Sequence, residues 1–98
     1  MNKTGIKKQV LEEIAELAQK HGVEKIVLFG SRARGDYHRA SDIDLALYGG
    51  DITMFTLDVE DTTSTLLTFD VIDMIKTLEE GFVKTIEKEG VVIYEKVW

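Results

Sequence analysis

The sequence contains neither cysteine nor proline among its 98 residues. Without cysteine the chain can form no disulfide and no thiolate metal site, which fits a reducing compartment. Without proline there is no proline-rich linker, and no low-complexity segment or internal repeat divides the chain. Since 44% of the residues are hydrophobic, residues 1–98 are expected to fold as a single domain around their own core.

Long apolar runs and positive charge are also scarce. No apolar run approaches the roughly 20 residues of a membrane-spanning helix, and no apolar core of a signal peptide follows the amino-terminal lysines. The net charge is −6, which disfavours direct binding of nucleic acid. We therefore expect a soluble cytoplasmic protein that has no direct contact with membranes.

Acidic residues are concentrated in one stretch of the chain. Between residues 51 and 70 there is no lysine or arginine, and the acids there are Asp51, Asp58, Glu60, Asp61 and Asp70. Such a run either faces a basic partner or is the solvated face of a helix. The sequence leaves both roles open.

Helical and strand patterns alternate along the chain. Helices are predicted over residues 6–20, 51–66 and 78–89, with Gly22 and Gly90 as stop signals after the first and the last. Strands are predicted over residues 25–29, 43–48, 68–73 and 91–94, with a short helical turn over 31–36. This order predicts an α/β (α+β) fold, a small mixed β-sheet with helices packed against it.

The most informative segment is a glycine-serine turn, Gly30-Ser31-Arg32-Ala33-Arg34-Gly35-Asp36, which follows the first predicted strand. A strand that ends in Gly-Ser and enters a helix directs backbone N–H groups forward, where they can bind phosphate. Gly30 permits a close backbone approach, Ser31 adds a hydroxyl donor, and Arg32 and Arg34 can add positive charge near a triphosphate. Alone the motif is weak, because an ordinary turn has the same residues.

Two aspartates, Asp42 and Asp44, begin the second predicted strand. Side chains at i and i+2 of a strand point to the same face, about 7 Å apart, so Ile43 and Leu45 are expected to face the core. Two such carboxylates repel each other unless a cation lies between them, and oxygen ligands suit Mg²⁺. The alternative is a solvated strand end with Asp42 capping a turn. Together with the glycine-serine turn, the pair predicts a Mg²⁺-dependent reaction on a nucleoside triphosphate.

A third carboxylate, Asp70, interrupts the apolar strand predicted over residues 68–73. An unpaired charge there is costly, which favours a functional role. If this strand lies beside the one with Asp42 and Asp44, Asp70 can share their metal or accept the proton of an attacking hydroxyl. Asp73 would lie on the opposite face of a straight strand, so Asp70 is the preferred third acid.

These residues resemble the nucleotidyltransferase superfamily that includes DNA polymerase β and kanamycin nucleotidyltransferase, and within it the minimal nucleotidyltransferases. The family pattern is Gly-Ser, about ten residues, Asp-X-Asp and a third acid on a later strand. The matching positions are Gly30-Ser31, residues 32–41, Asp42-Ile43-Asp44 and Asp70, and the resemblance covers nearly the whole chain. It implies a polymerase β-like core in which Ser31 and the turn backbone hold phosphates of ATP. Asp42, Asp44 and Asp70 would then bind Mg²⁺, and Asp70 would assist deprotonation of the acceptor.

The resemblance also implies a partner. Minimal nucleotidyltransferases lack the acceptor-binding domain of larger relatives and are commonly encoded beside a HEPN-domain protein, in a pair that resembles a toxin–antitoxin system. The implied function is that of an antitoxin that transfers AMP to a tyrosine of the HEPN ribonuclease. Two alternatives stay open: a weakly active or inactive nucleotide-binding antitoxin that acts by docking, and a small-molecule adenylyltransferase. Nucleotide preference, acceptor and homo- or hetero-oligomeric state are not determined by the sequence.

Overall fold

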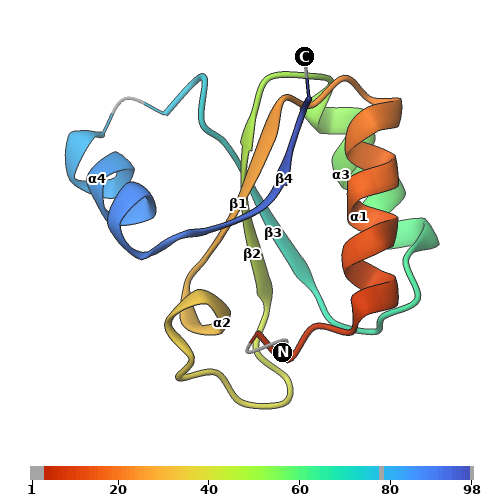
Figure 1. Ribbon diagram of the computed structural model, residues 1–98, viewed down its shortest axis with the longest axis horizontal. Coiled ribbons are helices and arrows are strands. Elements are labelled where there is room, and N and C mark those ends of the chain that lie inside the picture. Colours follow the sequence, from red (N-terminus) through yellow and green to blue (C-terminus); the bar gives the residue numbers. More distant parts are fainter. Residues whose placement is uncertain (1–3, 78, 98) are drawn as a thin grey trace.

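Four strands form one mixed sheet in the order β3-β2-β1-β4, in a computed structural model that describes residues 4–77 and 79–97 (Figure 1). Along the chain the elements are α1 (Lys8–Lys20), β1 (Lys25–Phe29), α2 (Ser31–Arg34), β2 (Ile43–Tyr48), α3 (Ile52–Thr62), β3 (Phe69–Asp73), α4 (Glu80–Glu89) and β4 (Val91–Glu95). Strand β1 runs antiparallel to β2 and β4, whereas β2 and β3 are parallel and are joined through α3. The predicted α+β class with a mixed sheet is confirmed.

The strands agree with prediction better than the helices do. Strands β1 and β2 have the predicted bounds, and β3 and β4 differ from prediction by one residue each. Helix α3 is shorter than predicted, because the β-branched stretch that begins at Thr62 disfavours further turns. Its start is fixed by Asp51, whose side chain accepts a hydrogen bond from the Met54 amide (3.1 Å). Helix α4 begins at Glu80, and the predicted first residue Leu78 lies outside the described residues.

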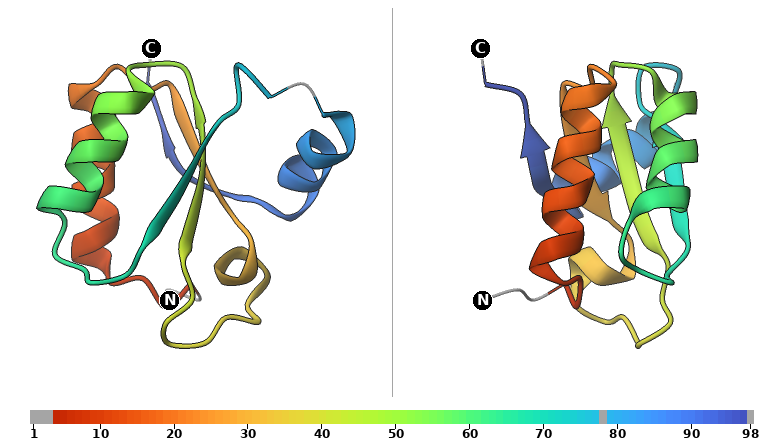
Figure 2. Two further views of the ribbon diagram at one scale, coloured as in Figure 1. Left: turned by 180° about the vertical axis from the view of Figure 1, so that it is seen from behind. Right: turned by 90° about the vertical axis from the view of Figure 1, so that its right-hand side faces the viewer.

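Helices cover both faces of the sheet, with α1 and α3 on one face and α4 on the other (Figures 1 and 2). On the α1/α3 side the core contains Ile14, Leu28, Ile43, Leu45 and Phe55, none of them exposed to solvent. The predicted inward orientation of Ile43 and Leu45 is thus confirmed. On the α4 side a smaller core contains Val27, Ala46, Met74 and Ile86. Since both faces are covered, β2 is apolar at almost every position after Asp44.

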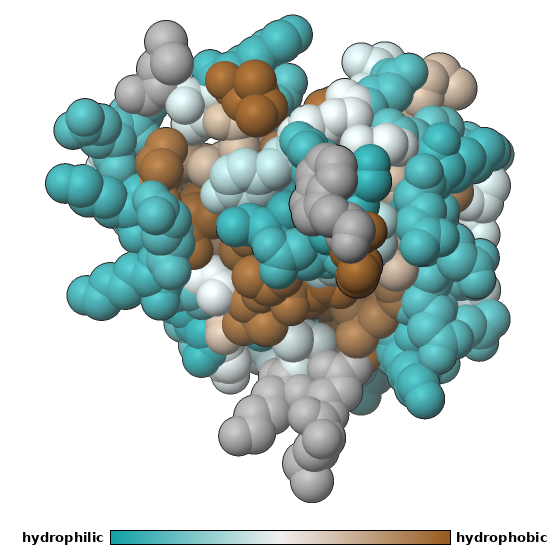
Figure 3. Space-filling model, turned by 45° about the horizontal axis from the view of Figure 1, so that its top comes forward, coloured by the Kyte–Doolittle hydropathy of each residue, from teal (hydrophilic) through white to brown (hydrophobic). Residues whose placement is uncertain are grey.

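The carboxyl-terminal strand β4 is an edge strand with exposed apolar side chains. Val91 and Val92 are 42% and 52% exposed. Figure 3 shows apolar side chains gathered in the middle of one face, between hydrophilic margins. None of the helices among the described residues has the length and hydrophobicity of a membrane-spanning segment.

The acidic run contributes to the fold. Besides the cap formed by Asp51, Asp58 of α3 accepts hydrogen bonds from His21 Nε2 (2.6 Å) and Lys20 Nζ (3.4 Å) at the end of α1. The hydrogen bond from His21 is the main cause that lowers the pKa of Asp58. Glu60 and Asp61 are exposed on α3. The run is therefore partly structural and partly a solvated helix face.

Candidate functional site

Gly30 brings the end of β1 against the carboxylate of Asp44. Its φ of 74° and ψ of −156° lie in a region that is accessible almost only to glycine. A Cβ atom at this position would collide with Oδ2 of Asp44. Helix α2 starts at the next residue, Ser31, which is half-buried. The glycine-serine turn and the second aspartate of the Asp-X-Asp motif are therefore in direct contact.

Strand pairing assembles the acids. Asp44 is the register partner of Phe29 in β1 and of Asp70 in the parallel strand β3. Residues in register on neighbouring strands point to the same face, so Asp44 and Asp70 lie side by side. Asp42 precedes β2 by one residue. Asp42 and Asp70 are exposed, whereas Asp44 is half-buried.

Asp73, the rejected alternative to Asp70, lies elsewhere. It is the register partner of Leu47, at the far end of the parallel pair. Its Oδ1 accepts a hydrogen bond from the Ile75 amide (3.0 Å), which forms the turn after β3. The geometry therefore associates Asp70, and not Asp73, with Asp44.

Negative charge at this position is unfavourable without a cation. Burial, followed by the charges of Asp70 and Asp42, raises the pKa of Asp44, while Arg34 lowers it. Carboxylate oxygens that repel one another in this way are the donor set that suits Mg²⁺. Within residues 4–77 and 79–97, no three acidic or histidine side chains are already arranged as a metal site.

This charge excess predicts that the site reduces stability. In metal-free buffer at pH 7, Asp44→Asn should raise the melting temperature by about 2–4 °C, because relief of a like-charge cross-strand pair yields about 0.5 kcal/mol. The measurement is thermal unfolding followed by circular dichroism, with Asp61→Asn on α3 as the matched control. A melting temperature equal to or below that of the parent would contradict the charge repulsion described above.

The higher melting temperature of Asp44→Asn should depend on pH, because the pKa of Asp44 is raised. Since the pKa of Asp44 is raised in the folded state, the folded protein binds this proton more tightly than the unfolded chain. Ionised Asp44 therefore destabilises the fold, and the penalty is lost as the pH falls through the raised pKa. The advantage of Asp44→Asn should shrink as the pH is lowered toward about 4.

The two predicted phosphate-binding arginines differ in their surroundings. Arg34 is exposed, its Nε donates to Asp36 (3.2 Å), and its charge acts on Asp44. Arg32 is only 2% exposed, and its guanidinium donates to three backbone carbonyls. The sequence suggested both as neighbours of a triphosphate, but only Arg34 presents its guanidinium to solvent beside the acids.

An aromatic pair beside the acids was not anticipated from the sequence. Phe29, the register partner of Asp44, makes an edge-to-face contact with Phe82 of α4, with ring centroids 5.7 Å apart. Phe29 could have been identified from its position directly before Gly30. Phe82 carries no such signal, because its proximity depends on how α4 packs against the sheet.

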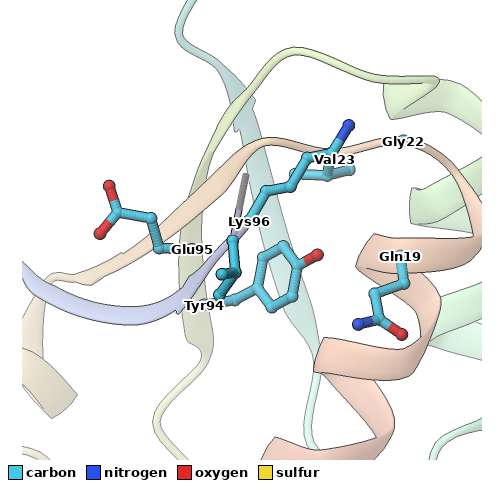
Figure 4. Close-up of a pocket in the computed structure, with 7 residues that line it drawn as sticks. Gln19, Gly22, Val23, Tyr94, Glu95 and Lys96 are labelled. Carbon is cyan, nitrogen blue, oxygen red and sulfur yellow. The ribbon is translucent and has the colours of Figure 1, made fainter.

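A separate pocket lies at the other end of the sheet (Figure 4). It has a volume of about 250 Å³ and is lined by Gln19, Gly22, Val23, Tyr94, Glu95, Lys96 and Val97. Figure 4 shows the Tyr94 ring between Lys96 and Gln19. Glu95 pairs with Lys25, the first residue of β1, whereas Asp44 pairs with the last. The pocket therefore does not belong to the carboxylate site.

Comparisons with known proteins identify relatives over most of the chain. Residues 12–97 match the family model described as Polymerase beta, Nucleotidyltransferase. A candidate protein adenylyltransferase, MJ0604 of Methanocaldococcus jannaschii, is 40% identical over 81 residues, which cover 74% of this chain and 79% of the relative.

Two solved structures have a similar fold. A toxin–antitoxin structure with AMP-PNP aligns with a TM-score of 0.72 at 20% identity, over 88% of this chain and 73% of the other. A candidate nucleotidyltransferase from Sulfolobus solfataricus aligns with a TM-score of 0.55 at 25% identity, over 91% and 79%. The predicted polymerase β-like core and the enzyme class are confirmed. The chain belongs to the polymerase beta nucleotidyltransferase family.

Proposed function

We propose that this enzyme transfers AMP from ATP, with Mg²⁺, to a tyrosine of a HEPN-domain toxin and thereby acts as its antitoxin. The observation that carries the proposal is the contact of Gly30 with Asp44, which in turn pairs in register with Asp70. The name of the 40% identical relative supports a protein as acceptor. The solved toxin–antitoxin structure with AMP-PNP supports a nucleotide and a toxin partner. The HEPN domain and its tyrosine follow from the resemblance to minimal nucleotidyltransferases.

The residues divide the chemistry among them. The backbone and hydroxyl of Ser31, beside Gly30, donate hydrogen bonds to phosphate oxygens, and Arg34 adds positive charge. Asp42, Asp44 and Asp70 are the residues that would bind Mg²⁺. The ion would neutralise negative charge on the phosphates.

Asp70 also has a role in proton transfer. Because it is exposed at the edge of the sheet, it can accept the proton of the incoming hydroxyl. The acceptor oxygen then bonds to the α-phosphorus, the bond from that phosphorus to the bridging oxygen breaks, and pyrophosphate leaves.

The experiment is incubation of the protein with Mg²⁺, ATP labelled at the α-phosphate, and a HEPN-domain protein whose gene lies beside the gene for this chain. We expect label on that protein, lost when its acceptor tyrosine is changed to phenylalanine and lost with Asp44→Ala of this chain. Asp61→Ala, which removes an exposed carboxylate from α3, is the control and should label normally. If the parent protein instead forms a tight complex with the HEPN-domain protein and transfers no label, the transfer proposal is wrong and the function is docking.

A further inference from the structure

Arg32 is the only charged side chain that is buried among the described residues. Its Nε donates to the carbonyl of Ser41 (3.1 Å), Nη1 to that of Thr4 (2.9 Å) and Nη2 to that of Arg39 (3.2 Å). The ring of Tyr37 lies 4.8 Å from its Cζ, in a cation–π contact. A buried charge is tolerated when its hydrogen-bond donors have partners. For Arg32, three backbone carbonyls accept the hydrogen bonds and an aromatic ring faces the charge.

Two of these contacts fix the loop of residues 35–42, which joins α2 to β2 and ends in Asp42. The Ser41 carbonyl belongs to the peptide bond that links Ser41 to Asp42, so the contact acts directly on the backbone of the acid. The loop is closed on itself as well. The His38 amide donates to Ser41 Oγ (2.9 Å), and the Ser41 amide donates to the His38 carbonyl (3.0 Å). Arg32 is therefore the link between this closed loop and α2, which follows the glycine-serine turn.

The third contact ties in the amino-terminal segment. Gly5, with φ of 72°, packs so closely that an added Cβ would lie 2.8 Å from Nη1 of Arg32 and 2.5 Å from the Tyr37 ring. Backbone that approaches this closely leaves no space for a ligand around Nη1. The guanidinium is thus also enclosed by the amino-terminal segment.

We propose that Arg32 is a positioning residue, which sets the place of Asp42 relative to the Gly30-Ser31 turn and does not contact the nucleotide. A guanidinium suits this task because its planar, rigid donors reach three carbonyls at once, whereas a lysine ammonium on a flexible stem would satisfy fewer of them. The inference rests on the proposed role of Asp42 as a metal ligand.

The first test is hydrogen exchange of the protein without ligands. In Arg32→Lys, the amides of His38 and Ser41 should exchange at least about tenfold faster, since their loop loses its anchor, while amides of β1 and β2 keep the parent rates. Arg39→Lys makes the same substitution in the same loop, at an exposed side chain, and should leave the exchange unchanged. Unchanged exchange at His38 and Ser41 in Arg32→Lys would overturn the inference.

The second test separates positioning from direct phosphate contact. Loss of a partner that orients a metal ligand weakens metal binding by about 10–100-fold. In Arg32→Lys the Mg²⁺ concentration for half-maximal transfer should therefore rise about tenfold, with KM for ATP close to the parent value at saturating Mg²⁺. A raised KM for ATP with unchanged Mg²⁺ dependence would instead assign Arg32 to the nucleotide.

Gly5→Ala approaches the same anchor from the other side. Its added Cβ would collide with the Tyr37 ring and with Nη1, which disturbs the anchor while the charge of Arg32 is kept. The same two changes are therefore expected, and they can be measured if Arg32→Lys does not fold. Parent-like exchange and Mg²⁺ dependence in Gly5→Ala would contradict the inference. If the parent protein transfers no nucleotide, the proposed function fails, whereas the exchange experiment still decides whether Arg32 anchors the loop.

Discussion

Replacement of Asp42 by alanine is expected to lower nucleotide transfer about a thousandfold or more while the protein stays folded. The rate is expected to fall because the proposed Mg²⁺ site would lose a carboxylate beside Asp44, and three decades of rate correspond to about 4 kcal/mol of transition-state stabilisation. The fold is retained because the Asp42 side chain is exposed, and exposed positions usually change stability by no more than about 0.5 kcal/mol. The measurement is the initial rate of labelling at saturating ATP and Mg²⁺, together with a thermal melt.

Asp61→Ala is the control for this prediction, because it removes the same charge from an exposed position on α3. It should transfer nucleotide at the parent rate. If Asp42→Ala transfers nucleotide at near the parent rate, the proposed catalytic role of Asp42 is wrong. Unfolding of Asp42→Ala would contradict the expectation that this exposed side chain contributes little to stability.

Substitution of Gly30 by alanine should lower transfer about a hundredfold and destabilise the fold by roughly 1–3 kcal/mol. The stability cost arises because φ of 74° with ψ of −156° is a region almost closed to residues with a Cβ. The activity loss has a second cause, since the new methyl group would occupy the space of the Asp44 carboxylate and push it from its place. Denaturant unfolding and the labelling assay measure the two effects.

Gly35 provides the matched control for Gly30. It also has a positive φ, of 93°, but an added Cβ would meet nothing within 4 Å. Its ψ of 3° places Gly35 in the left-handed α region, which residues with a Cβ adopt more readily than the conformation of Gly30. Gly35→Ala should therefore show milder backbone strain, without the displacement of Asp44, and retain far more activity than Gly30→Ala. If both variants lost activity equally, displacement of Asp44 would not explain the loss of activity in Gly30→Ala.

The sequence was sufficient for the local features of the site but not for their assembly. The bounds of β1 and β2 followed from short apolar runs, and the inward orientation of Ile43 and Leu45 followed from the pleat. That β3 runs parallel to β2, with Asp70 in register with Asp44, could be stated only as a condition. Strand direction and register depend on how α3 crosses back over the sheet, which no local pattern determines.

Arg32 illustrates the same limit at the level of one side chain. In the sequence it stands two positions from Arg34 and is chemically equivalent, so both were predicted to face a triphosphate. The structure separates them, because carbonyls of Thr4, Arg39 and Ser41 converge on Arg32. The Thr4 contact spans 28 positions of the chain. Such convergence is a product of tertiary packing, and the local sequence around the two arginines gives no indication of it.

The position of Asp70 on an edge strand has a consequence for self-association. An open strand edge is a template for pairing with another chain, and charged side chains on that edge oppose such pairing. Asp70 and Asp73 supply negative charge along β3, whereas exposed valines occupy the opposite edge strand. A neutral substitution of Asp70 would remove a carboxylate of the proposed site and also a charge that opposes aggregation. Asp42 lies outside the strands, so its variants keep the negative charge along β3. They are therefore the better choice for isolating a complex with an acceptor that has not been modified.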